Sequence, residues 1–296
     1  MVQAPPSLKA DVVSRQIESI VLAKIAGDKL VIPPMPEVAM QCLALLRDAN
    51  LQIKQLVTPL ERDPPLTANV LRLANSAAYG GGGNVRTIEQ AVSRLGNQKI
   101  KVLLVEASAS RMFQSRDPRI VEANAGVWEH SMAVALLARD LCALSSDGDA
   151  EGAYLAGLLH DVGKPIVAAI LLEAEKQLTA RSQNPWFNSD TWISVVQGIH
   201  RPVGLALADK WKLPDAVQSA IRDCSDFDSA NRKSVGNYVR FANALTKTLG
   251  IYVGPVDADD ARALVMIGRS LLDLDDEIIR RLSADVRERV QRQVHS

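Results

Sequence analysis

Apolar residues recur at helical spacing along almost the whole chain, and proline or glycine breaks interrupt this pattern at short intervals. Residues 9–26 are an example, because Ile17, Val21 and Ile25 fall on one face of a helix. The proline-rich run at 32–36 ends that helix, since proline excludes helical backbone and lacks an N–H donor. No segment alternates apolar and polar residues persistently, as a half-buried strand does. The sequence therefore predicts an all-α fold.

The breaks divide the chain into a series of mostly short helices. The expected helices cover residues 9–26, 37–46, 53–62, 66–77, 87–93, 127–144, 150–162, 165–180, 192–197, 203–211, 215–222, 235–249, 259–272 and 276–294. The glycine run at 80–83 is predicted to be a flexible connector. Gly96 is expected to close the helix predicted at 87–93. No repeat of fixed period appears, which argues against a helical solenoid.

Charge balance and cysteine content narrow the class of protein. The 296 residues carry 34 Lys and Arg against 34 Asp and Glu, so no global positive field attracts nucleic acid or an anionic membrane. The three cysteines form no CxxC pair, which argues against a disulfide framework or a zinc ribbon. The longest strongly apolar run, at 166–172, is too short to span a bilayer, and the N-terminal residues lack the apolar core of a signal peptide. We therefore expect a cytoplasmic protein with no nucleic-acid or membrane partner.

Three of the four histidines lie in the central part of the chain, at positions 130, 160 and 200. His130 falls on the apolar stripe of its predicted helix, so it is expected to point into the packed interior. His160 is followed by Asp161 at the end of an apolar helix, and Lys164 comes one turn later. Imidazole and carboxylate together suit a first-row divalent metal that activates water for phosphate-ester hydrolysis. The other interpretation is a buried network in which Asp161 accepts an imidazole N–H and fixes the helices in register.

Several segments, taken in their order along the chain, resemble those of a known family. They are PPMP at 33–36, DPPLT at 63–67, LRLANS at 71–76, AVSRLG at 91–96, WEHS at 128–131, AGLLHDVGK at 156–164, HRPVG at 200–204 and WKLP at 211–214. The two central segments are similar to the ligand segments of HD-type phosphohydrolases, and the others resemble the HD-related output domain, HDOD. The resemblance implies two helical lobes, one specific to HDOD and one a degenerate HD-like bundle.

The resemblance also implies an HD site, from which this chain departs. HD hydrolases hold a metal with a His, a His-Asp pair and a later Asp, and the first three correspond here to His130, His160 and Asp161. Asn243, a neutral donor, stands where the later carboxylate is expected, and residues 221–224 lack the His-His pair of the dinuclear relatives. An intact two-metal site is therefore not expected. We expect no cofactor, or at most one divalent transition metal held weakly. The predicted polar network comprises His130, His160, Asp161, Lys164 and His200.

The resemblance favours a bacterial signal-transduction protein that acts by protein–protein interaction, without catalysis, on a signalling partner. The alternative is a metal-dependent HD-type phosphohydrolase acting on a nucleotide or cyclic dinucleotide. The predicted domain organisation has an N-terminal helical extension at 1–28, an HDOD domain at 29–232 with lobes at 29–113 and 114–232, and C-terminal helices at 233–296 packed on the HD-like lobe.

Overall fold

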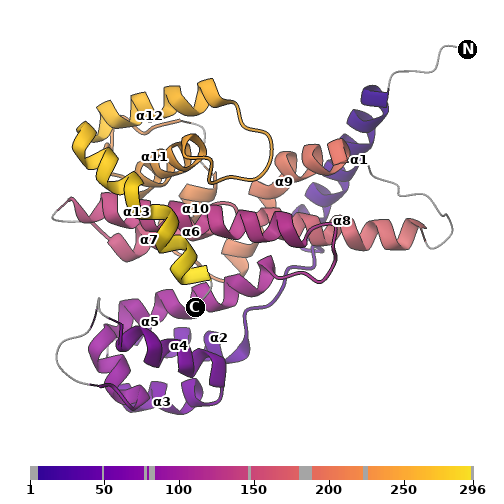
Figure 1. The fold of residues 1–296 in the computed structure, drawn as a ribbon. Coiled ribbons are helices and arrows are strands. Elements are labelled where there is room, and N and C mark those ends of the chain that lie inside the picture. The colour runs from indigo at the N-terminus through magenta and orange to yellow at the C-terminus, as the bar shows by residue number, and fades with distance from the viewer. Residues whose placement is uncertain are drawn as a thin grey trace, which may run out of the picture. The chain divides into compact units, whose positions relative to one another are not determined.

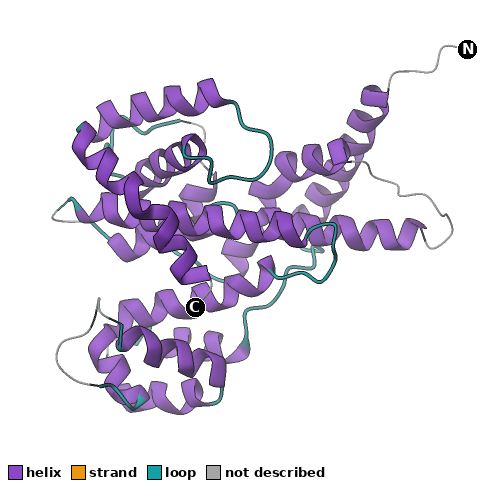
Figure 2. Ribbon diagram, in the orientation of Figure 1, coloured by secondary structure: helices purple, strands orange, loops and turns teal. Residues whose placement is uncertain are grey.

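The computed structural model describes residues 6–48, 50–76, 79, 84–145, 148–179, 189–222 and 226–294. Throughout these residues the regular secondary structure is helical, which confirms the all-α prediction (Figure 2). The chain divides into two units, one of Pro34–Arg111 and one of Met1–Pro33 with Met112–Ser296. The finer domain boundaries given above stay a prediction. The glycine connector at 80–83 and Cys224 lie outside the described residues.

The smaller unit is a cluster of short helices whose ends follow the proline breaks. It contains α2 (Glu37–Leu45), α3 (Ile53–Glu61), α4 (Pro64–Ala74) and nearly all of α5 (Ile88–Phe113), labelled in Figure 1. Asp63 caps α4, because its carboxylate accepts a hydrogen bond from the Leu66 backbone N–H at 3.1 Å. Two prolines fill the first turn of that helix, where no N–H is needed. Leu56, Leu60 and Val70 are fully buried in the core of this unit.

Gly96 does close a helix, but a second helix, which the sequence pattern did not predict, follows it directly. The backbone of Gly96 has φ 75° and ψ 164°, a left-handed conformation that glycine adopts without strain. The chain then continues as a helix to Phe113. Ile100 and Leu104, one turn apart, are buried on one side of this second part.

The larger unit is built around one buried helix. Its helices are α1 (Pro6–Ala26), α6 (Val121–Ala143), α7 (Ala150–Leu159), α8 (Gly163–Thr179), α9 (Ser189–Lys210), α10 (Asp215–Arg222), α11 (Val235–Thr248), α12 (Ala258–Leu272) and α13 (Asp276–Val294). Helices α7, α11 and α13 pack against α6, and α8 packs against α9 (Figure 1). Because α6 is covered on several sides, most of its side chains from position 130 onward are buried.

Several predicted helix boundaries in this unit were wrong. The helix expected at 127–144 begins at Val121. The segments expected at 192–197 and 203–211 are one helix, α9, which runs through Pro202. Val195, Ile199 and Val203 keep helical spacing across this proline and are almost fully buried, so packing outweighs the missing backbone hydrogen bond. The helix expected at 150–162 ends at Leu159, so the three residues before α8 form a tight turn.

The most apolar stretch of the larger unit is Ala150–Lys176, which comprises α7, the tight turn and most of α8. Its length and composition alone would allow it to cross a membrane. However, 89% of its most apolar 18-residue segment is buried inside the protein, as in the core of a soluble protein. Cys42 in the smaller unit and Cys142 in the larger one are buried free thiols, which pack as small apolar side chains.

Candidate functional site

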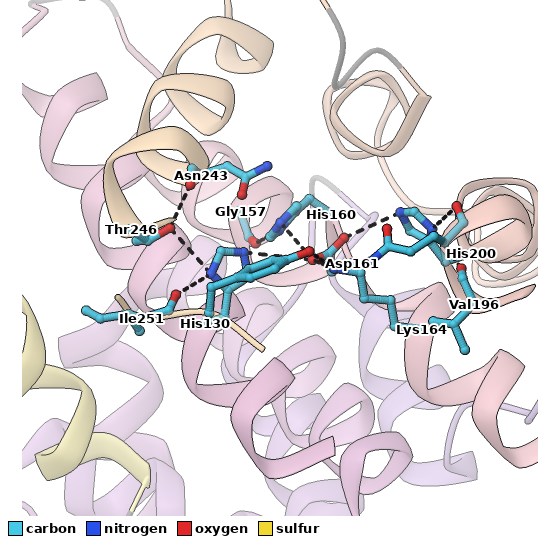
Figure 3. Close-up of polar contacts among 12 residues, drawn as sticks. His130, Gly157, His160, Asp161, Lys164, Val196, His200, Asn243, Thr246 and Ile251 are labelled. Carbon is cyan, nitrogen blue, oxygen red and sulfur yellow. Dashed lines mark hydrogen bonds and ion pairs between the residues drawn. The ribbon is translucent and has the colours of Figure 1, made fainter. Parts of the chain in front are cut away.

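The tight turn between α7 and α8 places Asp161 at the centre of a polar cluster (Figure 3). His160 is the C-cap of α7, and Lys164 lies in the first turn of α8. His130 projects from α6 and His200 from α9, so four segments of the larger unit supply the cluster. All five residues are buried, with exposed fractions between 1% and 7%. The sequence-predicted polar network is therefore a single site in space.

Distances within the cluster show a carboxylate surrounded by nitrogen atoms. Oδ2 of Asp161 lies 2.5 Å from Lys164 Nζ, 3.3 Å from His160 Nε2 and 3.8 Å from His130 Nε2. The other oxygen, Oδ1, lies 3.6 Å from His200 Nε2. Ligand atoms of His130, His160 and Asp161 all lie within 4.8 Å of one another, which is close enough for one metal ion to reach all three.

Two glycines allow the helices that carry these side chains to approach so closely. A Cβ atom on Gly157 in α7 would lie 2.7 Å from the Cα atom of Ala135 in α6, nearer than such atoms pack. A Cβ atom on Gly163 would overlap the backbone carbonyl of His200 in α9. The first contact brings His130 and His160 together, and the second brings His200 to Asp161. The glycines of the AGLLHDVGK segment therefore position the site.

Backbone carbonyl groups fix the orientation of all three imidazole rings. The Nδ1 atoms lie within hydrogen-bond distance of a carbonyl oxygen in the pairs His130–Ile251 at 2.8 Å, His160–Gly157 at 2.7 Å and His200–Val196 at 3.0 Å (Figure 3). A carbonyl only accepts, so Nδ1 carries the proton of each neutral ring. The Nε2 atoms then present lone pairs to the cluster, which is the form in which histidine binds a metal.

Several atoms that face the cluster have no hydrogen-bond partner among the described residues. They are His130 Nε2, His160 Nε2 and Asn243 Oδ1, all buried. Each is an acceptor in the neutral state, and the Asp161 carboxylate beside them also only accepts. Acceptors that converge in this way require a positive charge between them, either a proton on an imidazole or a cation. Asn243 comes from α11 with its amide oxygen turned toward the cluster (Figure 3). The residues present therefore fit one divalent cation.

Burial and charge act on the titration of the cluster in opposite directions. Burial lowers the pKa of His130 to about 3, and the neighbouring His160 ring acts in the same direction. Burial also lowers the pKa of His200. For Asp161, burial acts to raise the pKa, but His160 and Lys164 outweigh it and hold the pKa well below its usual range. Burial acts to lower the pKa of Lys164, yet Asp161 holds it above its usual value. At neutral pH Asp161 and Lys164 thus form a buried ion pair.

Tyr252, which the sequence analysis did not identify, closes one side of the cluster. Its ring lies 5.0 Å from the His130 ring, edge to face, and Lys164 Nζ sits 4.9 Å from the centre of the same ring. The Tyr252 hydroxyl is also 3.4 Å from Lys164 Nζ. The residue lies in the loop after α11, in a stretch without helical periodicity or any motif that would have drawn attention to it.

A family model for the HDOD domain matches residues 32–227 of this chain. A Treponema pallidum protein of uncharacterised function is 27% identical over 241 residues, which are 79% of this chain but 46% of that protein. The chain thus spans about half the length of this curated relative. The match to the HDOD model alone covers well over half of the chain.

Solved structures share the fold. A proposed metal-dependent phosphohydrolase from Shewanella amazonensis has a TM-score of 0.71 and 21% identity, with 94% of this chain and 99% of that chain covered. An HDOD domain protein of unknown function from Geobacter sulfurreducens has a TM-score of 0.64 and 20% identity, with 93% and 98% covered. A proposed signal transduction protein from Marinobacter aquaeolei has a TM-score of 0.60 and 23% identity, with 90% and 60% covered. The sequence match and the shared helical fold agree, and the chain belongs to the HDOD domain family.

Proposed function

We propose that this chain is a bacterial signal-transduction module that acts by binding another protein and not by hydrolysing phosphoesters. The observation that carries the proposal is the 2.5 Å contact between Lys164 Nζ and Asp161 Oδ2. Oδ2 is also the carboxylate oxygen that His130 and His160 approach, so it is the oxygen that a metal would use. An ammonium group of the chain itself already neutralises it. A catalytic metal would have to compete with this internal cation for its anionic ligand.

A second feature weakens catalysis further. Asn243 offers a neutral oxygen where the HD pattern has a carboxylate, so a bound metal would receive less negative charge from the protein. The Lys164 side chain and Tyr252 also cover the cluster on one side. In this proposal the cluster stabilises the packing of α6, α7, α8 and α9, and signalling proceeds through the protein surface.

The second candidate function is a metal-dependent phosphohydrolase acting on a nucleotide or cyclic dinucleotide. It is favoured by the unpartnered His130 Nε2, His160 Nε2 and Asn243 Oδ1 atoms. With Asp161 they would hold one divalent transition metal. Such a metal, when bound, acts as a Lewis acid and lowers the pKa of a coordinated water. Holding a metal is compatible with both functions, because a metal can also serve structure alone.

Activity assays with matched variants separate the two functions. The purified chain is loaded in turn with Mn, Fe, Ni or Zn, its metal content is measured, and it is assayed with bis(p-nitrophenyl) phosphate and with a cyclic dinucleotide. We expect turnover no higher than that of Asp161→Asn with any metal. Turnover that requires the metal and disappears in both Asp161→Asn and His160→Gln would establish the phosphohydrolase instead.

The interaction itself is tested in the cells from which the chain comes. The tagged chain is crosslinked in those cells, its partners are identified by mass spectrometry, and the complex is rebuilt from the two purified proteins. We expect the native chain and a folded His160→Gln variant to bind the same signalling partner with similar affinity. Failure to rebuild any complex from purified proteins would contradict the proposal.

A further inference from the structure

A pocket of about 480 Å³ lies in the larger unit, next to the histidine cluster, and Lys164 belongs to both. It is formed by the start of α6, by α8 and α9, and by residues 253–255. Ile120, Val127, Trp192 and Val253 supply apolar walls. This volume is within the range of pockets that hold small organic molecules. The pocket is therefore large enough for a compound of two fused rings with substituents.

The charged residues that line the pocket are balanced by neighbours. Lys164, at the end nearest the cluster, is paired with Asp161 at 2.5 Å. Arg119 is paired with Glu175 at 2.5 Å and with Asp117 at 2.9 Å. No lining residue thus carries an uncompensated positive charge that would hold an anion, and Glu175 is almost fully buried. A neutral ligand suits this balance, since an anion would meet the carboxylates of these pairs.

Two buried donors give the pocket a polar end. Asn124 is 4% exposed and lines the pocket, and its carboxamide carries two N–H donors. The Lys164 ammonium has three N–H donors, of which Asp161 and the Tyr252 hydroxyl take two. Lys164 also lines the pocket. A carbonyl oxygen between these two side chains would accept a hydrogen bond from each of them.

We propose that this pocket is a binding site for a neutral, largely apolar small molecule with one hydrogen-bond-accepting head, such as the carbonyl of a ketone, lactone or amide. Its apolar body lies against Trp192 and the aliphatic walls, and its carbonyl accepts from Asn124 and Lys164. The site is separate from the protein-binding role proposed above and does not need a metal. It gives a signalling module a means of responding to a small organic molecule.

A fluorescent naphthyl ketone, Prodan, tests the proposal because it is neutral, apolar and carries one carbonyl. Titrated into the full chain and excited directly, it should show a saturable blue shift with one site per chain and a Kd on the order of 100 µM or tighter. The Ala123→Trp variant places an indole over the pocket from an exposed position of α6 and should abolish the saturable signal. Ala125→Trp, on the same helix but outside the pocket, should bind like the native chain. Equal binding by the two variants would overturn the proposal.

The polar end is tested with a second variant and a charged probe. Asn124→Leu keeps the size of the side chain but removes its donor, and should weaken Prodan binding by about three- to tenfold. Its melting temperature is measured alongside, and a folded variant with unchanged affinity would refute the assigned head group. Two competitors of Prodan are then compared: the anionic dye anilinonaphthalene sulfonate, and a neutral naphthyl ketone that lacks the amine group of Prodan. The anionic dye should displace Prodan more weakly than the neutral ketone. Tighter binding of the anion would refute the neutral ligand class.

Discussion

Replacing Lys164 by methionine tests the ion pair at the centre of the cluster. The ammonium lies 2.5 Å from Asp161 Oδ2, and the two side chains are each only 8% exposed. At an effective dielectric constant of about 20, this separation corresponds to a gross attraction of about 7 kcal/mol, from which desolvation subtracts. Removal of one partner leaves a buried, uncompensated charge, which costs about 3–5 kcal/mol. We expect Lys164→Met to lower the free energy of unfolding by this amount at neutral pH without added metal.

The assay is urea unfolding of the full chain in the presence of a chelator, followed by tryptophan fluorescence. Lys164→Met is compared with Asp161→Asn and with the double variant, and the double variant should lose less than the sum of the single changes. Two further results should follow for Lys164→Met. Acidification should reduce its deficit, because the folded state can take up a proton, and added Zn or Mn should restore stability by replacing the ammonium. A loss below about 1 kcal/mol, insensitive to metal, would refute the assignment of Lys164 as the balancing cation.

Three more predictions concern other parts of the larger unit. Burial lowers the pKa of His130 to about 3 from an ordinary 6.5, so between these values only the unfolded chain binds the proton. Because of His130, unfolding free energy should therefore fall as pH drops below 6.5, by up to about 1.4 kcal/mol per pH unit, and His130→Gln should reduce the measured slope by this amount in urea titrations. Gly163→Ala should cost about 1–3 kcal/mol in calorimetry through its overlap with the His200 carbonyl, whereas Gly236→Ala, which has open surroundings, should not destabilise. Asn243→Asp should tighten Zn binding at least about tenfold in titration calorimetry, and unchanged affinity would show that position 243 is not a ligand.

The fold was predictable wherever apolar spacing and chain breaks agree. The helices α10 and α13 have the predicted bounds, because polar residues with clear capping or turn preferences border an amphipathic pattern. Prediction failed at residues 97–113, which contain a short apolar run whose period does not distinguish helix from strand. It failed again at Pro202, because the rule that proline ends a helix considers only the local sequence. Burial of one face of α9 keeps the helix continuous there.

The side chains of the site could be identified from the sequence, but their electrostatics could not. His130, His160 and Asp161 stand in segments with family resemblance, and the structure brings them within reach of one metal. The proton positions depend on backbone carbonyls, and the carbonyl of Ile251 lies 121 residues from the ring that it fixes. A backbone oxygen leaves no signature in a sequence, so these contacts could not be predicted from it.

The loop at residues 251–255 takes part in both the cluster and the pocket. Ile251 accepts from His130, Tyr252 covers Lys164, and the three residues that follow line the pocket. A cation in the cluster or an organic molecule in the pocket would restrain this same loop, and the entropy of ordering it would be lost only once. Each occupant would then raise the affinity for the other by an equal factor. Because of this reciprocity, the larger unit would respond most strongly when a metal and a small molecule are bound at the same time.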